Sequence, residues 1–343
     1  MKKIDLQANR IMKNNIRPHH LISIITPSYN QGRFIEETIK SVLSQEGDFY
    51  IDYIIMDGGS TDNSIEIVRR YDRLLRDGEW PVKCRGIDFR WVSKKDRGQS
   101  DAIAKGFGMS NGEILAWLNS DDTYLPGVVK RAADFFHTHL DVKMLYGKCY
   151  FIDYKGSVVG EYPTEPFDYK RLATSNFICQ PATFFRKDVL YTVGGLDLTL
   201  QYSMDYDLWI RIVSRFEVKY LSEYLAMYRL HKESKTVAEA SALKRNEECL
   251  KTIIKHYGWA PANRVYAYHC MRIISKMPLY LRRFKPFIMI LAIIVSLKEY
   301  IQLNKGIRLY DIRLLSPIYI KKIFTGWESE SIIRRNEGRG RES

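Results

Sequence analysis

The chain has 343 residues, of which 45% are hydrophobic and 27% charged, with 21 glycines and 11 prolines. These values predict a folded protein with a sizeable core and exclude a collagen, a disordered chain and a small disulfide-stapled domain. The formal net charge is +13, and residues 261–343 hold 16 Lys or Arg against 6 Asp or Glu, a net of +10 that leaves +3 for residues 1–260. Such a basic segment indicates an anionic partner, a nucleic acid or a membrane surface, although a solvated basic tail would have the same composition.

The first part of the chain alternates apolar runs with segments of helical period. Apolar runs without polar alternation are typical of parallel strands that are buried on both faces. Strands are expected at 21–26, where Pro27 would stop the strand, and at 51–56, 89–92 and 113–118; helices are expected at 33–43, 64–75, 99–109 and after Pro126. Four strand–helix alternations predict a doubly wound, mostly parallel α/β sheet that binds ligands at the carboxyl ends of its strands.

The pattern is less regular beyond residue 140. A hairpin is expected from 143–152 and 157–160, further strands at 182–185, 218–221 and 224–229, and a helix at 204–214. From residue 238 onward the pattern is mainly helical. The chain is therefore expected to consist of an N-terminal lead (1–19), a main domain (20–235, with halves 20–125 and 126–235) and a helical, basic C-terminal region (236–343).

Polar residues follow the predicted strands. Neither G-x-G-x-x-G nor a P-loop pattern is present. Asp57, followed by two glycines, could accept the ring N–H of a uracil or guanine, or could hold a turn while Asp62 or Thr61 caps the next helix. Asp121 and Asp122 could divide their roles between a ribose hydroxyl and a Mg²⁺ or Mn²⁺ ion on a diphosphate, or one of them could cap the following helix.

Together these motifs resemble family 2 glycosyltransferases of the GT-A fold, inverting enzymes that use nucleotide-activated sugars. The resemblance covers residues 20–235 and rests on ITPSYN (25–30), DGGSTD (57–62), DRGQSDA (96–102), AWLNSDD (116–122) and MDYDLW (204–209). It implies a mostly parallel, twisted sheet flanked by helices. It also implies that Asp57 contacts the base, Asp121 the ribose and Asp122 the metal. The residues expected to bind the nucleotide sugar are Pro27, Ser28, Tyr29, Asn30, Asp57, Gln99, Asp101, Ser120 and Asp121.

The same resemblance assigns Asp205 as the general base that deprotonates the acceptor hydroxyl. Inversion requires such a base opposite the leaving diphosphate, and a cation for the developing charge. The chain departs from the family in Met204, where Glu is frequent, and in Ala104, where many members have Asn. Asp207 is the alternative base, although it could instead fix Arg211 one helical turn further on.

His231 also resembles a family position that reaches the metal or the diphosphate, and imidazole is an acceptable ligand for Mn²⁺. It is therefore the second expected metal ligand, beside Asp122. Arg229 could assist with phosphate charge through its planar donor fork.

The basic C-terminal region includes a candidate membrane segment at 280–298. Its uncharged stretch, 286–297, has 12 residues, whereas a bilayer span needs about 20. The flanking cations Arg282, Arg283, Lys285 and Lys298 favour a helix at an anionic lipid interface, with a core helix as the alternative. No nucleic-acid-binding pattern accompanies the charge, and the N-terminus lacks an apolar signal, so we expect a cytoplasmic protein, peripheral on the inner face of the cell membrane.

The sequence therefore predicts an inverting, divalent-metal-dependent glycosyltransferase of bacterial-type surface polysaccharide synthesis. Its donor would be a nucleoside-diphosphate sugar, with UDP favoured, and its acceptor a hydroxyl of a glycan or a lipid-linked glycan. One alternative is a sugar nucleotidyltransferase, which would need a Gly- and Arg-rich loop after the first strand that the sequence lacks. The other is an inactive, membrane-anchored scaffold that binds sugar nucleotides.

Overall fold

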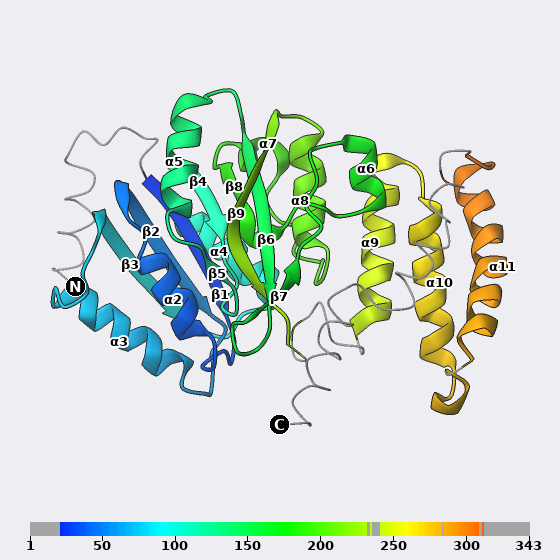
Figure 1. Cartoon of the computed structure of the whole chain (residues 1–343), viewed down its shortest axis with the longest axis horizontal. Helices are drawn as coiled ribbons and strands as arrows, with labels where there is room; N and C mark the ends of the chain where they lie inside the picture. The colour runs from blue at the N-terminus through cyan, green and yellow to red at the C-terminus, as the bar shows by residue number, and fades with distance from the viewer. Residues whose placement is uncertain (1–20, 232–233, 235–240, 283, 309–310, 312–343) are drawn as a thin grey trace.

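The computed structural model describes residues 21–231, 234, 241–282, 284–308 and 311 (Figure 1). The predicted lead, 1–19, lies outside these residues. The strands are β1 (Leu21–Ser28), β2 (Gly47–Asp57), β3 (Cys84–Ser93), β4 (Ile114–Trp117), β5 (Thr123–Tyr124), β6 (Met144–Ile152), β7 (Val158–Glu161), β8 (Thr183–Arg186) and β9 (Val218–Arg229). The helices are α2 (Ile35–Leu43), α3 (Ser64–Arg76), α4 (Gln99–Met109), α5 (Val128–Thr138), α6 (Tyr169–Thr174), α7 (Val189–Val193), α8 (Met204–Val213), α9 (Ala242–Tyr257), α10 (Ala262–Lys276) and α11 (Lys285–Asn304).

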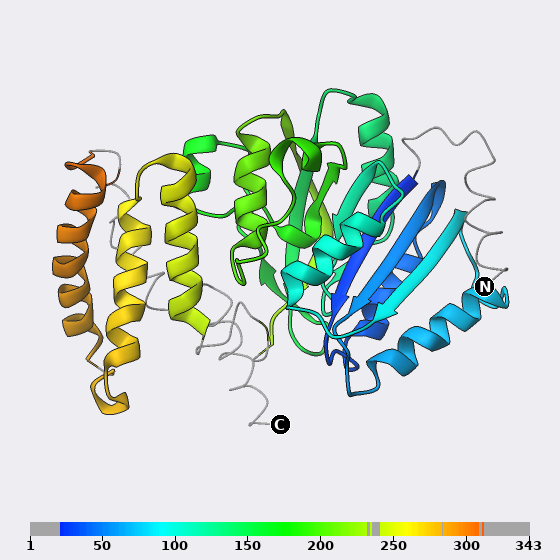
Figure 2. The same cartoon turned by 180° about the vertical axis from the view of Figure 1, so that it is seen from behind.

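The strands form one nine-stranded sheet in the order β3-β2-β1-β4-β8-β6-β9-β5, with β7 paired to β6. Helices cover both faces: α2, α3 and α5 pack on one core cluster, and α4 and α8 on the other. Figure 2 shows the α4 side of the sheet. The predicted α/β architecture is confirmed.

The predicted parallel half of the sheet comprises β1 to β4. β1 lies between β2 and β4, and β2 pairs with β3, all in parallel. Ser28 lies opposite Asp57, which lies opposite Ser93. The polar residues that follow these strands therefore meet at one edge, because parallel strands end together.

Pro27 does not end β1, contrary to the sequence prediction. The strand continues to Ser28, whose carbonyl accepts the amide of Gly58 at 2.8 Å. The carbonyl of Ile25 faces the other side of β1, the side of β4, and accepts the amide of Leu118 at 2.9 Å. The backbone nitrogen of Pro27, two residues further along the strand, faces the same side. The register with β4 ends at the Ile25–Trp117 pair. A proline at this position therefore costs no ladder hydrogen bond.

The second half of the sheet is mixed. β8 is antiparallel to β4 and β6, β7 forms the predicted hairpin with β6, and β9 is parallel to β6. The two strands predicted at 218–221 and 224–229 are one strand, whose register with β6 shifts near Gly147 and Lys148. A Cβ on Gly147 would lie 2.9 Å from the carbonyl oxygen of Glu223, so this irregularity depends on a glycine.

The C-terminal helices lie side by side at one end of the molecule, with α9 nearest the sheet and α11 outermost (Figures 1 and 2). Many apolar side chains of α11 are exposed. Within the described residues, one helical stretch, Pro286–Asn304, has the length and apolar composition of a membrane span, with a mean hydropathy of 1.7. The uncharged run is 12 residues as counted from the sequence, but the helix continues through Lys298 and Glu299. It therefore reaches 20 residues.

Candidate functional site

Asp57, at the end of β2, is 3% exposed and holds the turn that follows it. Its Oδ2 accepts the amides of Gly59 and Ser60, both at 2.9 Å, and the hydroxyl of Ser93 at 2.7 Å. Its Oδ1 accepts the Ser60 hydroxyl. The turn-holding role that the sequence left open is thus present, and it fixes the orientation of the carboxylate.

A hollow opens beside Asp57. Its lining has three apolar residues, Met56, Val92 and Ala102. It also has four charged ones: Asp57, Lys94, Asp96 and Lys105. A hollow that offers both apolar contacts and polar groups can hold a small organic ligand. Ser93, Lys94 and Lys105 were not predicted. Ser93 could have been found from its position at the end of the third strand.

The loop after β1 is joined to the loop after β2 by hydrogen bonds. Asn30 has a positive φ of 53° and accepts the Thr61 amide at 2.8 Å through its side-chain oxygen. Asp62 accepts the amides of Gly32 at 2.8 Å and Ser64 at 3.0 Å. These bonds leave Tyr29 60% exposed at the rim of the sheet. Asn tolerates this left-handed conformation better than most residues.

Ser28 points its hydroxyl into the protein at the same edge. The residue is 5% exposed, and among the described residues its Oγ has no hydrogen-bond partner. A buried polar group without a partner is costly, so a ligand group that reached this hydroxyl would gain a hydrogen bond. Pro27 precedes it in β1 and is buried.

The acidic pair follows β4. Asp122 is 1% exposed; its Oδ1 accepts the Arg229 amide at 2.8 Å and its Oδ2 accepts the Asn119 side-chain amide at 3.2 Å. Asp121 is partly exposed, and its Oδ2 lies 3.0 Å from Nε2 of His231. The structure therefore brings Asp121 and His231 into contact, with Asp122 next to Asp121 in the chain.

The electrostatics of this pair fit a cation. Burial, and next the charge of Asp121, raise the pKa of Asp122 well above its ordinary value. A divalent ion would relieve that cost, and each carboxylate oxygen has a lone pair beyond those used in the bonds above. Among the described residues no group of three or more ligating side chains converges. The protein would thus supply few ligands, as Mg²⁺ sites completed by substrate phosphates do.

Arg229 has a different role from the one suggested by its sequence position. It is 1% exposed, and its guanidinium donates to the carbonyls of Asp121 at 2.9 Å and Asp153 at 3.1 Å. It also pairs with Glu37 of α2. These partners occupy the donor fork, so Arg229 holds the acidic pair in place rather than presenting charge to a phosphate.

Gln99 and Asp101, at the start of α4, lie beside the same loop. Gln99 donates to the side-chain oxygen of Asn119 at 2.8 Å, and Asn119 donates to Gln180 at 3.0 Å. Asp101 is 4% exposed and pairs with Lys105 at 2.6 Å and Arg97 at 3.0 Å.

The bond to Lys105 and those to Arg97 lower the pKa of Asp101 despite partial desolvation. Ser120 is buried, next to the acids. Asn119 and Gln180 were not predicted, and no local pattern singles out Gln180.

Asp205 and Asp207, at the start of α8, have opposite environments. Asp205 is half-buried and accepts only the amide of Tyr206, at 2.7 Å, among the described residues; burial raises its pKa to about 6. Asp207 is fully buried and bonds to Arg211 at 2.6 Å and His256 at 2.7 Å. Burial raises the pKa of Asp207, but the hydrogen bond from His256 and the charge of Arg211 outweigh it and hold the pKa at about 2. Asp207 therefore fixes Arg211, and Asp205 is the better proton acceptor.

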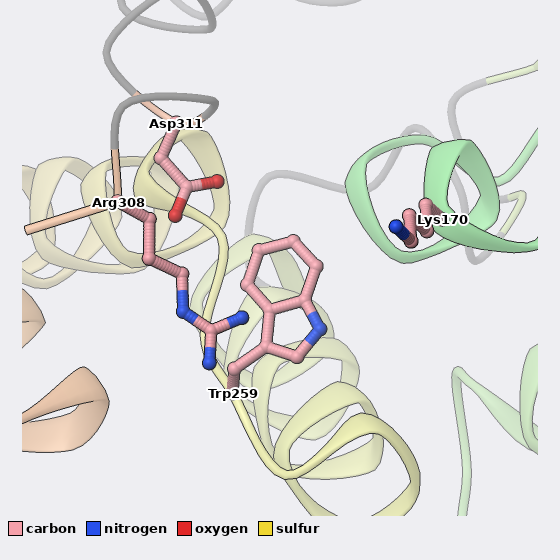
Figure 3. A pocket seen from close by; sticks show the side chains of 4 residues that line it. All are labelled: Lys170, Trp259, Arg308 and Asp311. Atoms are coloured by element: carbon pink, nitrogen blue, oxygen red, sulfur yellow. The ribbon is translucent and has the colours of Figure 1, made fainter.

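A separate hollow lies between α6 and the C-terminal region (Figure 3). It is lined by Lys170, Trp259, Arg308 and Asp311. The Arg308 guanidinium lies over the Trp259 ring, 5.1 Å from its centroid. None of these four residues belongs to the site around Asp57, Asp121 and Asp122 described above.

Comparison with known proteins gives the family. The model of "Glycosyl transferase family 2" matches residues 23–194. An uncharacterised glycosyltransferase of Nostoc sp. is 30% identical over 239 residues, 66% of this chain and 70% of that protein. Chondroitin synthase of Escherichia coli is 23% identical over 247 residues, 70% of this chain and 34% of that protein.

Solved structures share the fold. S. aureus TarS 1–349, in complex with UDP-GlcNAc, superposes with a TM-score of 0.55 at 15% identity, covering 94% of this chain and 91% of that one. The mannosyltransferase PcManGT of Pyrobaculum calidifontis, in complex with GDP-Man and Mn²⁺, superposes with a TM-score of 0.54 at 15% identity, covering 95% and 90%.

Proposed function

Because the chain belongs to glycosyltransferase family 2, we propose that it moves one sugar from a nucleoside diphosphate to a hydroxyl of a glycan or lipid-linked acceptor. The favoured nucleoside diphosphate is UDP, and the transfer inverts the configuration at the anomeric carbon of the sugar. The observation that carries the proposal is a contrast between two acidic positions: an acidic pair that suits a cation and includes the buried Asp122, and the half-buried Asp205, whose pKa is raised. Inverting, metal-assisted sugar transfer uses both.

The nucleotide half of the proposal rests on the edge formed by β1, β2 and β4. The base would lie in the hollow beside Asp57, whose carboxylate accepts its ring N–H. Ser28, Tyr29 and Asn30 would border the nucleoside, and Asp121 would accept a ribose hydroxyl. The nucleotide-binding edge would be completed by Gln99, Asp101 and Ser120. Gln99 donates a hydrogen bond to Asn119, in the loop that carries Asp121 and Asp122.

The metal would be Mg²⁺ or Mn²⁺, held by Asp122 with Asp121 and His231 beside it, and it would supply charge neutralisation of the leaving diphosphate. The protein residues do the rest. Arg229 and Asn119 hold Asp122 in one orientation through the hydrogen bonds described above. Asp205 takes the proton of the acceptor hydroxyl as its oxygen attacks the anomeric carbon from the face opposite the diphosphate.

The acceptor is proposed to be carried at the inner surface of the cell membrane, and α11 supports this. Its exposed apolar side chains include Phe287 (60%), Ile290 (59%), Ile294 (62%) and Leu297 (49%). Arg282 and Lys298 adjoin them in the sequence. An apolar helical face with flanking cations binds anionic bilayers.

The test is direct. Isothermal titration of the full chain with UDP or GDP, with and without Mn²⁺, measures nucleotide choice and metal dependence. Mass spectrometry of a panel of sugar nucleotides then measures which donor is consumed. Binding of UDP with Mn²⁺, together with hydrolysis or transfer that D205N abolishes, supports the proposal. Nucleotide binding without consumption of any donor, and without an effect of D205N, would instead support a scaffold.

A further inference from the structure

A carboxylate of the C-terminal helices lies at the beginning of the helix that carries Asp205. Glu248 in α9 accepts the amides of Tyr202 at 2.7 Å and Ser203 at 3.2 Å through Oε2. It also accepts the amide of Gln201 at 3.1 Å through both oxygens. Helix α8 starts at Met204, so one side chain binds the three consecutive amides that precede it.

These bonds are of the kind that fixes a helix start. Ser203 is the N-cap of α8 and the other two amides precede it, so the carboxylate lies at the N-terminal end of the helix, where the helix dipole favours a negative charge. Hydrogen bonds from amides to an ionised carboxylate are also stronger than neutral ones. Because Glu248 lies 45 residues from Ser203 in the sequence, it fixes the α8 start relative to α9.

The same segment is held by α4. The Ser100 hydroxyl donates to the carbonyl of Leu200 at 2.7 Å and lies 2.7 Å from Sδ of Met204. Ser100 follows Gln99, which bonds to the loop of the acidic pair. The residues that lead into Asp205 are therefore held between α9 and the helix that borders the nucleotide edge.

Asp205 itself has little else to orient it. The hydrogen bond to its carboxylate within the described residues comes from its own neighbour, the Tyr206 amide. No side chain from another described element bonds to this carboxylate. The direction in which Asp205 points is consequently set by the backbone at the start of α8.

We propose that Glu248 is a positioning residue for Asp205: its carboxylate fixes residues 201–203 so that the general base faces the acceptor hydroxyl. Glu248 touches these backbone amides and acts through them. The inference rests on the proposed function, since it takes Asp205 as the base. It also makes α9 part of the catalytic apparatus.

The experiment compares E248Q and E248A with E247Q in the full chain. Glu247 is the adjacent residue of α9 and pairs on the surface with Lys251 at 2.6 Å, which makes it a matched control. The measurements are kcat, the KM for the donor, the Kd for UDP, and hydrogen exchange of the amides of residues 201–203. E248A is expected to lower kcat roughly 10- to 100-fold, the effect of a small displacement of a catalytic group. Donor KM and UDP Kd are expected to stay within about twofold, because the nucleotide edge is intact.

E248Q keeps the size and one acceptor oxygen of Glu248, so its kcat is expected to lie between those of E248A and the wild type. Exchange at 201–203 is expected to rise in both variants and not in E247Q. Adding E248A to D205N is expected to lower kcat no further than D205N alone, because both changes impair the same proton transfer. If E248A does not fold, E248Q carries the test.

Two results would overturn the proposal. One is a kcat for the Glu248 variants equal to that of E247Q. The other is a parallel loss of kcat and UDP affinity, which would indicate general support of the fold. Full activity of D205N would be a failure of the proposed function instead, and faster exchange at 201–203 in E248A would then identify Glu248 as an anchor of α8 alone.

Discussion

The backbone amide of Arg229 donates to Oδ1 of Asp122 at 2.8 Å, across 107 residues of sequence. The last residue of β9 thus fixes the acid that follows β4. The Arg229 side chain adds a bond to the carbonyl of Asp121 and an ion pair with Glu37 of α2. Three elements far apart in the chain therefore determine where the acidic pair lies.

Replacing Asp122 with Asn is expected to remove the metal dependence of nucleotide binding. Asn keeps the size of Asp and can still accept the Arg229 amide, but it loses the oxygen that accepts from Asn119 and the charge that a divalent cation requires. Titration calorimetry with UDP should give a Mn²⁺-dependent affinity at least about tenfold weaker than that of the wild type, the scale on which loss even of an outer partner acts. Wild-type protein in EDTA should bind UDP as D122N does. An undiminished response of D122N to Mn²⁺ would refute Asp122 as the ligand.

Replacing Asp205 with Asn is expected to lower kcat by about 100-fold or more, the contribution of a positioned general base. For the wild type, kcat should rise with pH through about 6 and level off above it, because burial raises the pKa of Asp205 to about 6 and only the ionised form accepts a proton. Initial rates between pH 4.5 and 8.5 measure this profile. The rising limb should be missing from the residual activity of D205N. A wild-type rate that is flat down to pH 5 would exclude Asp205 as the base.

Replacing Asp207 with Asn is expected to destabilise the protein at neutral pH. Its ion pairs hold its pKa at about 2 against an ordinary 3.8, so its ionisation favours the folded state. This contribution, about 2 kcal/mol, is fully present above pH 3.8 and is lost as the pH falls through about 2.

Urea unfolding of D207N should give a free energy of unfolding lower by at least about that amount at pH 7, with a smaller difference at pH 3. The control is D134N, which removes an exposed pair with Lys130 and should change stability by less than about 0.5 kcal/mol. Equal effects of D207N and D134N would contradict the structural role of Asp207.

The outer face of α11 is expected to bind anionic lipid. The full chain should sediment with vesicles containing phosphatidylglycerol, and added salt should weaken this binding. The double substitution I290E/I294E should reduce the bound fraction at least about tenfold, because each fully buried Ile contributes about 1.5 to 3 kcal/mol.

The control for this experiment is L140E/V158E, which alters two apolar residues that are similarly exposed, at 58% and 55%, but lie outside the C-terminal helices. It should sediment with the vesicles as the wild type does. Equal sedimentation of I290E/I294E would instead refute the lipid-binding face.

Much of the fold could be predicted because its first half is encoded locally. Apolar runs and helical spacing predicted β1 to β4, and the bounds of α4, Gln99–Met109, are those expected. His231, which follows β9, lies 3.0 Å from Asp121, a contact that the sequence could suggest only through the family resemblance. The prediction that Pro27 stops the first strand was wrong. Proline lacks an amide hydrogen, but at this position the neighbouring strand β4 has already ended, so no ladder hydrogen bond is lost.

Long-range contacts could not be predicted. The sequence around Arg229 is compatible with a buried structural role and with an exposed, phosphate-binding role. Only the packing of the folded chain, in which Arg229 is buried, distinguishes the two. Gln180 reaches Asn119 across 61 residues, and Glu248 reaches Tyr202 across 46. Both are ordinary polar residues in their local context, so their roles depend on tertiary structure alone. The candidate membrane segment was taken to 298, whereas α11 continues to Asn304.

The position of Glu248 has a practical consequence for dissecting this protein. The family match ends at residue 194, and a shortened version cut after 235 would look complete by sequence alone. Such a version would lack α9 and with it the Glu248 carboxylate that accepts the amides of residues 201–203. Any minimal soluble enzyme derived from this chain should extend at least to Gly258, which follows α9.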